Sequence, residues 1–256
     1  LFADAKAYAA PGTSDLPLQW LDVSSPDCVL PDKVSRLYDR GGYAILRRKE
    51  ICVYLRYPRF KFRPGQADAL HLDLWINGRN ILRDAGSYSY NTEPRWASYF
   101  PGTAAHNTVE FDGRDQMPRL GRFLFGDWLR TCDRGDIEES REQSRFSVGY
   151  RDGQRAMHHR TVVLRRNCLV VEDKVTGFRE RAVLRWRFEP GAWHLHDTTV
   201  TNGQFRLTVV ADVAVHRIEL AQGWESRYYL NREPLPVLEI EIRVPGVVRT
   251  EMNWAP

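Results

Sequence analysis

Short apolar segments separated by turn dipeptides recur along most of this chain and constrain its fold more than any other feature. Asn77-Gly78 separates the segments Ala67–Ile76 and Asn80–Asp84. Asn and Gly both tolerate positive φ, so this pair predicts a tight hairpin between two strands. Similar turn signals occur at Asp112-Gly113, Asp152-Gly153, Thr176-Gly177, Pro190-Gly191 and Asn202-Gly203. Many short strands with few helical runs predict an all-β chain, a large antiparallel β-sandwich of two or more stacked sheets.

A second hairpin is expected where Tyr43–Arg47 and Ile51–Tyr57 flank Arg48-Lys49-Glu50. Helix is scarce, and Arg95–Tyr99 is the one short helical turn that the pattern indicates. The remaining strands are predicted at Asn107–Phe111, Phe146–Tyr150, Arg160–Arg165, Leu169–Asp173, Val183–Phe188, Phe205–Val210, Val215–Leu220, Val237–Val244 and Val247–Met252.

The first 40 residues differ from the rest of the chain. Prolines punctuate them, and no long periodic run appears. We interpret residues 1–40 as an irregular N-terminal arm or linker from an upstream domain, and residues 41–256 as the β-domain. The chain has no apolar run of about 18 residues or more, so no membrane-spanning helix is expected.

The basic residues of this chain are almost all arginines. The net charge is +4, and only five of the 37 basic residues are lysines. The planar guanidinium fork suits carboxylate, sulfate or phosphate groups, which favours an anionic partner, although codon bias explains the composition equally well. No nucleic-acid-binding motif accompanies the charge, so we expect no nucleic-acid partner.

Polar residues gather between positions 62 and 130, beginning with Gln66, Asp68, His71 and Asp73. Alternate residues of a strand share a face, so His71 and Asp73 should lie together, with Gln66 and Asp68 on the opposite face. Imidazole and carboxylate groups are ordinary zinc ligands. A buried hydrogen bond between His and Asp that pins two strands is the alternative.

Three ordered stretches resemble the C-terminal β-domain of the heparinase II/III family. They are Gln66-Ala67-Asp68-Ala69-Leu70-His71-Leu72-Asp73-Leu74, then Gly78 to Gly86 with Tyr88 and Tyr90, and then Ala105-His106-Asn107-Thr108-Val109 followed by Asp112-Gly113-Arg114-Asp115-Gln116. The resemblance implies degradation of uronate-containing polysaccharide by β-elimination, in which a base removes the C5 proton and an acid protonates the leaving oxygen. It also implies an upstream α/α toroid, a substrate cleft between the two domains, and a periplasmic or secreted location.

The resemblance also suggests roles for individual residues. Asp84 and His106 match the family's ligands for a divalent ion, Zn or Ca, and Gln66 stands where the family has a third ligand, a histidine. Pro64 replaces a catalytic histidine of some members, so His71 is expected to supply an imidazole instead. The catalytic candidates are His71, His106 and Tyr90, and the candidates for substrate binding are Tyr88, Arg95, Arg114 and Arg119. Asn107 is expected to hydrogen-bond a loop backbone.

Two functions follow from these residues. The first is the β-domain of a polysaccharide lyase acting on an acidic glycan of the heparan or alginate kind, inactive without its upstream domain. The second is a non-catalytic glycan-binding or scaffold domain in exopolysaccharide biosynthesis or export, which the Pro64 and Gln66 replacements favour.

Overall fold

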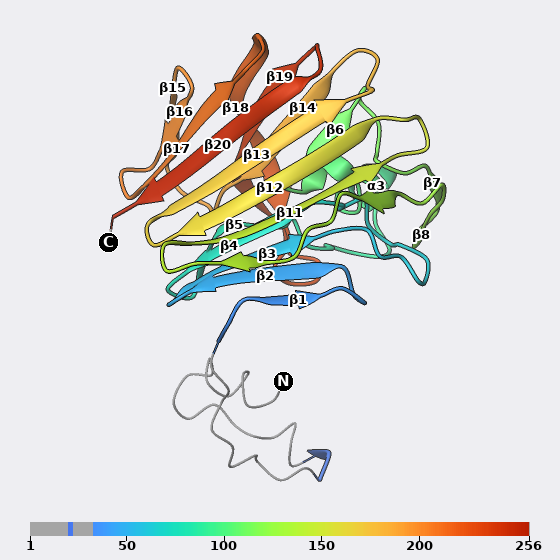
Figure 1. Cartoon of the computed structure of the whole chain (residues 1–256). Helices are drawn as coiled ribbons and strands as arrows, with labels where there is room; N and C mark the ends of the chain where they lie inside the picture. Colours follow the sequence, from blue (N-terminus) through green and yellow to red (C-terminus); the bar gives the residue numbers. More distant parts are fainter. Residues whose placement is uncertain (1–19, 23–32, 256) are drawn as a thin grey trace. The chain divides into compact units, whose positions relative to one another are not determined.

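The computed structural model of this chain describes residues 20–22 and 33–255 (Figure 1). The chain divides after Val34 into two units, and the fold below is that of the second unit. Most of the predicted N-terminal arm, residues 1–40, lies outside the described residues. The first sheet strand already begins at Arg36, within the range given to the arm, because Arg36–Tyr38 pairs with Tyr43–Ile45.

A nine-stranded antiparallel sheet forms one layer of the second unit. Its order is β10-β11-β12-β13-β20-β17-β16-β15, and β9 pairs with β11 beside β10. Residues along β12 alternate between buried and less buried positions, which places Val162 and Leu164 on the core side. The strands are β9 (Arg130–Cys132), β10 (Glu138–Glu139), β11 (Gln143–Arg151), β12 (Met157–Arg165), β13 (Cys168–Thr176), β15 (His194–His196), β16 (Thr199–Thr201), β17 (Phe205–Ala211) and β20 (Gly246–Trp254).

Two smaller sheets form the facing layer. They meet at an isolated antiparallel bridge between Leu82, at the end of β5, and Phe188, just after β14. The five-stranded sheet contains β1 (Arg36–Tyr38), β2 (Tyr43–Arg48), β3 (Ile51–Arg56), β4 (Leu72–Ile76) and β5 (Arg79–Leu82) in that order. The four-stranded sheet has the order β18 (Val215–Glu225), β19 (Glu233–Ile242), β14 (Ala182–Arg187) and β6 (Val109–Phe111).

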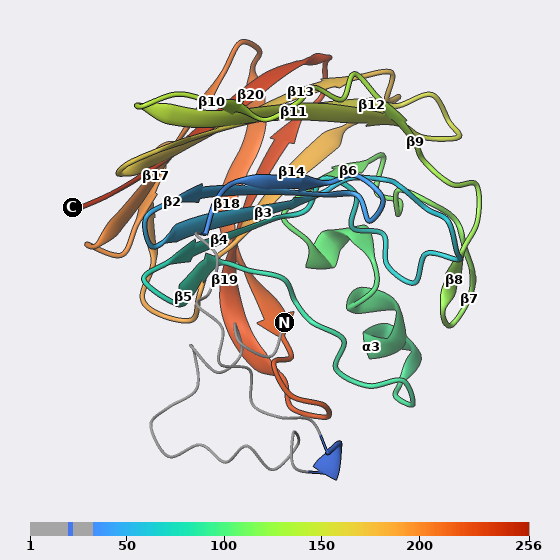
Figure 2. The ribbon, with the colours of Figure 1, turned by 60° about the horizontal axis from the view of Figure 1, so that its bottom comes forward.

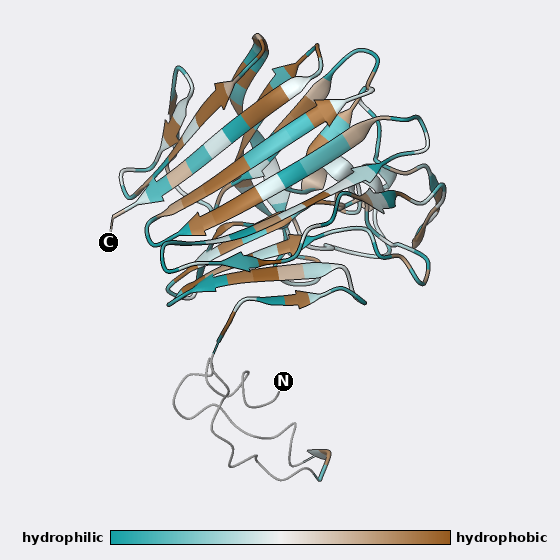
Figure 3. Ribbon diagram, in the orientation of Figure 1, coloured by the Kyte–Doolittle hydropathy of each residue, from teal (hydrophilic) through white to brown (hydrophobic). Residues whose placement is uncertain are grey.

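The core lies between the two layers, which Figure 2 shows one above the other. Leu46 and Val53 of the five-stranded sheet, Phe146 and Val162 of the nine-stranded sheet, and Trp186 of β14 are all almost completely buried. Burial of each large apolar side chain contributes about 1.5–3 kcal/mol. Hydrophobic and hydrophilic residues are interspersed along the strands of the nine-stranded sheet (Figure 3), as expected where one face is packed and the other is solvated. The predicted antiparallel β-sandwich is confirmed.

The predicted helical turn is also confirmed, as α3 (Pro94–Tyr99). Proline at the first turn suits a helix start because its missing N–H would have no partner there. Trp96 and Phe100 pack with Ala85 and Ala105 in a small separate core. The short 3-10 helix η1 (Thr103–Ala105) and a two-stranded ribbon of β7 (Arg119–Gly121) and β8 (Leu124–Phe125) complete this part of the fold. In the described part of the chain, no helix has the length and apolar character needed to span a membrane.

Candidate functional site

The segment before β4 is a turn rather than the beginning of a long strand. Leu70 has φ of +59°, its N–H donates to the Arg56 carbonyl, and β4 starts only at Leu72. The strand predicted from Ala67 to Ile76 was therefore wrong in its first half. Because the alternation of faces is broken at Leu70, Gln66 and Asp68 line the same hollow as His71 and Asp73, and the predicted opposite face was also wrong.

The side chain of Asn107 fills a gap between strands just behind this turn. Its amide nitrogen donates to the carbonyls of Leu72 (2.8 Å) and Arg83 (3.3 Å), and its oxygen accepts the N–H of Arg187 (2.6 Å). Asn107 bonds backbone groups as predicted, but two of the three belong to strands β4 and β14 rather than to a loop. Its own N–H donates to Nδ1 of His71 at 2.9 Å, which fixes the orientation of that imidazole ring.

Buried arginine also supports the turn. Arg160 is fully buried, and its Nη1 donates to the carbonyls of Leu70 (2.5 Å) and Asn107 (2.7 Å). Its charge is balanced by Asp173, whose Oδ1 accepts from Nε of Arg160 at 2.6 Å. Buried charges are tolerated only when they are paired and hydrogen-bonded, so this network is a structural base for the site.

His71, Asp84 and His106 converge above this base. Nδ1 of His106 lies 2.7 Å from Oδ2 of Asp84, and Nε2 of His71 lies 3.7 Å from the same oxygen. Nε2 of His71 also lies 3.3 Å from Oδ1 of Asp73, which confirms that these two residues share a face. Asp84 additionally accepts the N–H of Gly86 at 2.6 Å, so it also caps a turn.

Asp84 is a carboxylate in this arrangement. Burial raises the pKa of Asp84. The hydrogen-bonded imidazole of His106 and the nearby imidazole of His71 together outweigh that effect. The net result holds the pKa of Asp84 well below its ordinary value. A negative charge therefore stays between the two imidazoles at neutral pH.

Distances alone would admit a metal ion, because one atom from each of the three residues lies within 4.8 Å of the others. The hydrogen bonds argue against it. A ligating histidine normally donates its other ring N–H to an acceptor, whereas Nδ1 of His71 accepts an N–H from Asn107. Neutral His71 therefore carries its proton on Nε2, the atom that would have to bind the ion. In this arrangement Nε2 of His71 could bind an ion only if the hydrogen bond from Asn107 to Nδ1 were lost.

Two further polar atoms of the predicted site are buried without a partner in the part of the chain that the structure describes. One is Oε1 of Gln66, which has no hydrogen-bond partner among the described residues. Nε2 of His106 is likewise buried and unpartnered in the described structure. His106 is 0% exposed, so its ring is shielded from solvent.

His71 and Asp84 face a hollow of about 300 Å³ on the protein surface. The floor is polar and anionic, and the rim adds phenol and guanidinium groups that can donate hydrogen bonds. Arg56 pairs with Asp68 across this rim, and its guanidinium lies 5.9 Å from the ring centroid of Tyr43. The lining residues are Tyr43, Tyr54, Arg56, Gln66, Asp68, His71, Asp73 and Asp84.

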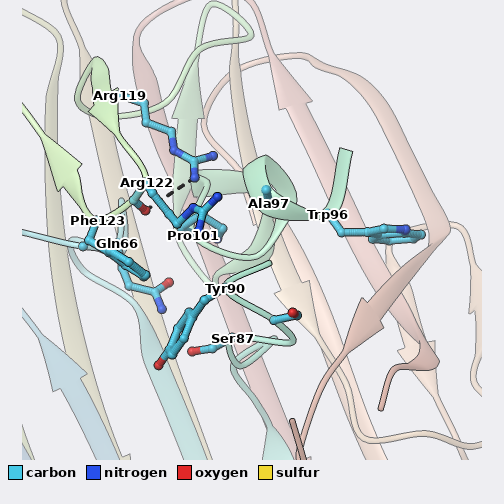
Figure 4. Close-up of a pocket in the computed structure, with 11 residues that line it drawn as sticks. Gln66, Ser87, Tyr90, Trp96, Ala97, Pro101, Arg119, Arg122 and Phe123 are labelled. Atoms are coloured by element: carbon cyan, nitrogen blue, oxygen red, sulfur yellow. Dashed lines mark hydrogen bonds between the residues drawn. The ribbon is translucent and has the colours of Figure 1, made fainter. Parts of the chain in front are cut away.

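A narrower hollow of about 60 Å³ is also lined by Gln66 (Figure 4). Tyr90 and Phe123 contact each other edge to face here, with ring centroids 5.1 Å apart. Arg119 and Arg122 add two guanidinium groups, and Arg119 donates to the carbonyl of Arg122 at 3.5 Å. Because Gln66 borders both hollows, they are neighbours along one surface.

Three of the predicted substrate-binding residues lie outside both hollows. The ring of Tyr88 stacks on Phe100 at 5.4 Å in the small aromatic core. Arg95 is exposed on α3, with its guanidinium 4.6 Å from the Trp96 ring centroid. Arg114 forms an ion pair with the buried carboxylate of Asp152 at 2.5 Å. Of the predicted set, the structure brings together Gln66, His71, Asp84 and His106, with Tyr90 and Arg119 next to them.

Sequence reasoning missed the rim residues Tyr43, Tyr54, Arg56, Arg122 and Phe123. Alternation along Ile51–Arg56 was a usable signal, because it places Tyr54 and Arg56 on one face, away from the buried Val53 and Leu55. Arg122 and Phe123 sit in the turn of a two-stranded ribbon that no sequence pattern indicated.

Comparison with known proteins agrees with this architecture. The solved structure titled heparinase III, BT4657 gene product, has a TM-score of 0.76 at 17% identity over 96% of this chain and 39% of that chain. Heparan sulfate lyase HepC from Pedobacter heparinus has a TM-score of 0.70 at 17% identity over 99% of this chain and 41% of that chain. This chain thus spans about two fifths of the length of those structures.

At these identities the structures show a shared fold. No curated protein sequence matches the chain. Residues 31–255 match the family described as heparinase II/III-like, C-terminal. The chain therefore belongs to the heparinase II/III-like family, as a copy of its C-terminal β-domain.

Proposed function

We propose that this chain is the β-domain of a polysaccharide lyase that cleaves a uronate-containing glycan by β-elimination. The observation that carries the proposal is the position of the imidazole of His71, which faces an open hollow and is oriented by Asn107 on one side and two carboxylates on the other. A heparinase III and a heparan sulfate lyase with the same fold support the substrate class.

The elimination requires a base, an acid and a group that neutralises the uronate carboxylate. The base takes the C5 proton, the electrons form the double bond between C4 and C5, and the C4–O bond breaks while the acid protonates the departing oxygen. The Nε2–H of His71 is suited to the acid role, because its proton is held at the surface of the hollow. Arg119 and Arg122 are suited to neutralise the uronate carboxylate.

The base is assigned to an upstream α/α domain that covers this surface, as the family resemblance implies. Under this proposal the chain alone has little activity, and its partners are the acidic polysaccharide and that domain. A periplasmic or secreted location belongs to the same proposal, because such polymers are found outside the cytoplasm.

The test uses the full-length protein with alginate, heparan sulfate, hyaluronan and chondroitin, followed by the ultraviolet absorbance of the unsaturated uronate product. We expect a signal with at least one polymer, and a loss of about 10²-fold or more in kcat for His71→Ala, as for removal of a general acid. His194→Ala removes an exposed imidazole elsewhere and should leave the rate unchanged. Unchanged kcat in His71→Ala would refute the acid role.

A glycan-binding domain without catalysis is the second candidate. It is favoured by Gln66, which stands where the family has an imidazole, and by the complete burial of His106. Measurable binding of an acidic glycan without product from any of the four polymers would select this function.

A further inference from the structure

A third hollow, strongly basic, lies away from the His71 site. It has a volume of about 640 Å³ and is formed where three hairpin tips meet: the β2–β3 turn, the β10–β11 turn and the β12–β13 turn. Arg48, Lys49, Arg141, Arg165 and Arg166 line it, against a single carboxylate, Glu142. We call these six residues and the space between them the basic groove.

The groove is held in shape by its own side chains. Nη1 and Nη2 of Arg48 donate to the carbonyls of Arg141 (3.0 Å) and Ser140 (2.5 Å), which ties two hairpin tips together across more than 90 residues of sequence. On the third tip, Nε of Arg165 donates to Oε1 of Gln143 at 3.3 Å. Prearranged groups lose less entropy when a ligand binds.

The lining chemistry identifies the class of ligand. Guanidinium forks pair with carboxylate and sulfate oxygens, and five cations against one anion leave most of that capacity for a ligand. No aromatic side chain lines the groove, so neither a nucleobase nor a sugar face finds a stacking partner there. These features fit the charged groups of a repeating polyanion better than a single aromatic ligand.

The groove and the His71 hollow lie at opposite ends of β3 and β4. Ile51 lines the groove and pairs with Ile76, whereas Leu55 pairs with Leu72, the residue next to His71. The two pairs are four residue steps apart along β3, which corresponds to roughly 13 Å. In Figure 2, β10 and the C-terminal end of β20 lie on the left, opposite α3, β7 and β8 on the right.

We propose that the basic groove is a second binding site for an acidic polysaccharide, separate from the site of chemistry. The groove anchors a distant stretch of the polymer through sulfate or carboxylate groups. The class of glycan in this proposal rests on the proposed function. Binding here lengthens the time that the polymer stays on the domain without contacting the reacting sugar.

The test compares binding of the 256-residue chain to immobilised heparin, alginate and neutral dextran by biolayer interferometry. Arg165→Ala/Arg166→Ala removes two exposed guanidiniums from the groove, and Arg155→Ala/Arg179→Ala removes two exposed ones near the opposite end of β12 and β13. We expect the groove variant to raise Kd for heparin about ten-fold, or roughly 1.4 kcal/mol, and the control variant to change it less than about two-fold. If the groove variant also loses affinity for alginate, the groove binds carboxylate as well as sulfate groups. If it loses affinity for heparin alone, the groove binds sulfate groups.

Both double variants should have the melting temperature of the wild type, which verifies that they are folded. Arg141→Ala serves as a second groove variant. Heparin binding is measured without product formation, so a silent lyase assay leaves this result unchanged. Equal losses in the groove and control variants, no loss in either groove variant, equal binding of dextran, or tighter binding of polyuridylate RNA than of heparin would each overturn the proposal.

Discussion

Replacement of Asn107 by alanine should destabilise the β-domain strongly, although the side chain is small and polar. The Asn107 side chain is fully buried and satisfies three backbone groups, which belong to β4, to the residue after β5 and to β14. Alanine leaves the carbonyls of Leu72 and Arg83 and the N–H of Arg187 without that partner.

The magnitude follows from those three bonds. Each buried backbone group left without a partner costs about 1–3 kcal/mol. Two of the bonds are short, at 2.6 and 2.8 Å, and the third is weaker at 3.3 Å. The expected loss is therefore about 4 kcal/mol of unfolding free energy, a large share of the 5–15 kcal/mol typical of a domain.

Urea denaturation followed by tryptophan fluorescence measures this loss as a lower midpoint at an unchanged slope. Asn231→Ala is the matched control, because Asn231 is exposed and its one side-chain bond, to Glu233, is 3.3 Å long. That variant should change stability by less than about 0.5 kcal/mol. A loss below about 1 kcal/mol in Asn107→Ala would refute the reasoning from unsatisfied backbone groups.

Three further outcomes can be measured on the same chain. Zinc should bind the wild type no more tightly than it binds His71→Ala, because an amide N–H occupies Nδ1 of His71; one tight equivalent in calorimetry that disappears in the variant would show the contrary. Burial raises the pKa of Asp173, but the charge of Arg160 outweighs this effect, so the net pKa is lowered. The contribution of Asp173 to the stability of the folded domain is therefore complete above the unfolded pKa near 3.9 and is lost as the pH falls. A urea midpoint that stays constant from about pH 5 to 2 would contradict this. Gly86→Ala should cost about 2 kcal/mol or more, because φ is +78° and the added Cβ would lie 2.2 Å from the Ser226 carbonyl oxygen; an unchanged melting temperature would disprove the clash.

Local chemistry made part of the fold predictable. Asn77 and Gly78 have positive φ values of 50° and 77°, as the hairpin dipeptide indicated. The pairing of His71 with Asp73 followed from strand alternation. Strands of two or three residues, such as β1 and β15, were missed because they are too short to show a period.

The errors at the site arose from long-range contacts. Leu70 adopts a left-handed conformation that no local rule marks, and it is held there by Arg160, 90 residues away. Arg114 was expected at a ligand but is bound to Asp152, which lies 38 residues further along the chain. Such pairings depend on which strands become neighbours, and composition or spacing does not reveal that.

The hollow at His71 combines a rigid base with an accessible border. The base includes Asn107 and Arg160, which are completely buried and bond backbone groups, whereas Tyr43 and Gln66 at the border are partly exposed. Mutations can therefore accumulate at the border at small thermodynamic expense. Ligand preference in this domain is free to diverge through the border residues while the underlying scaffold stays constant.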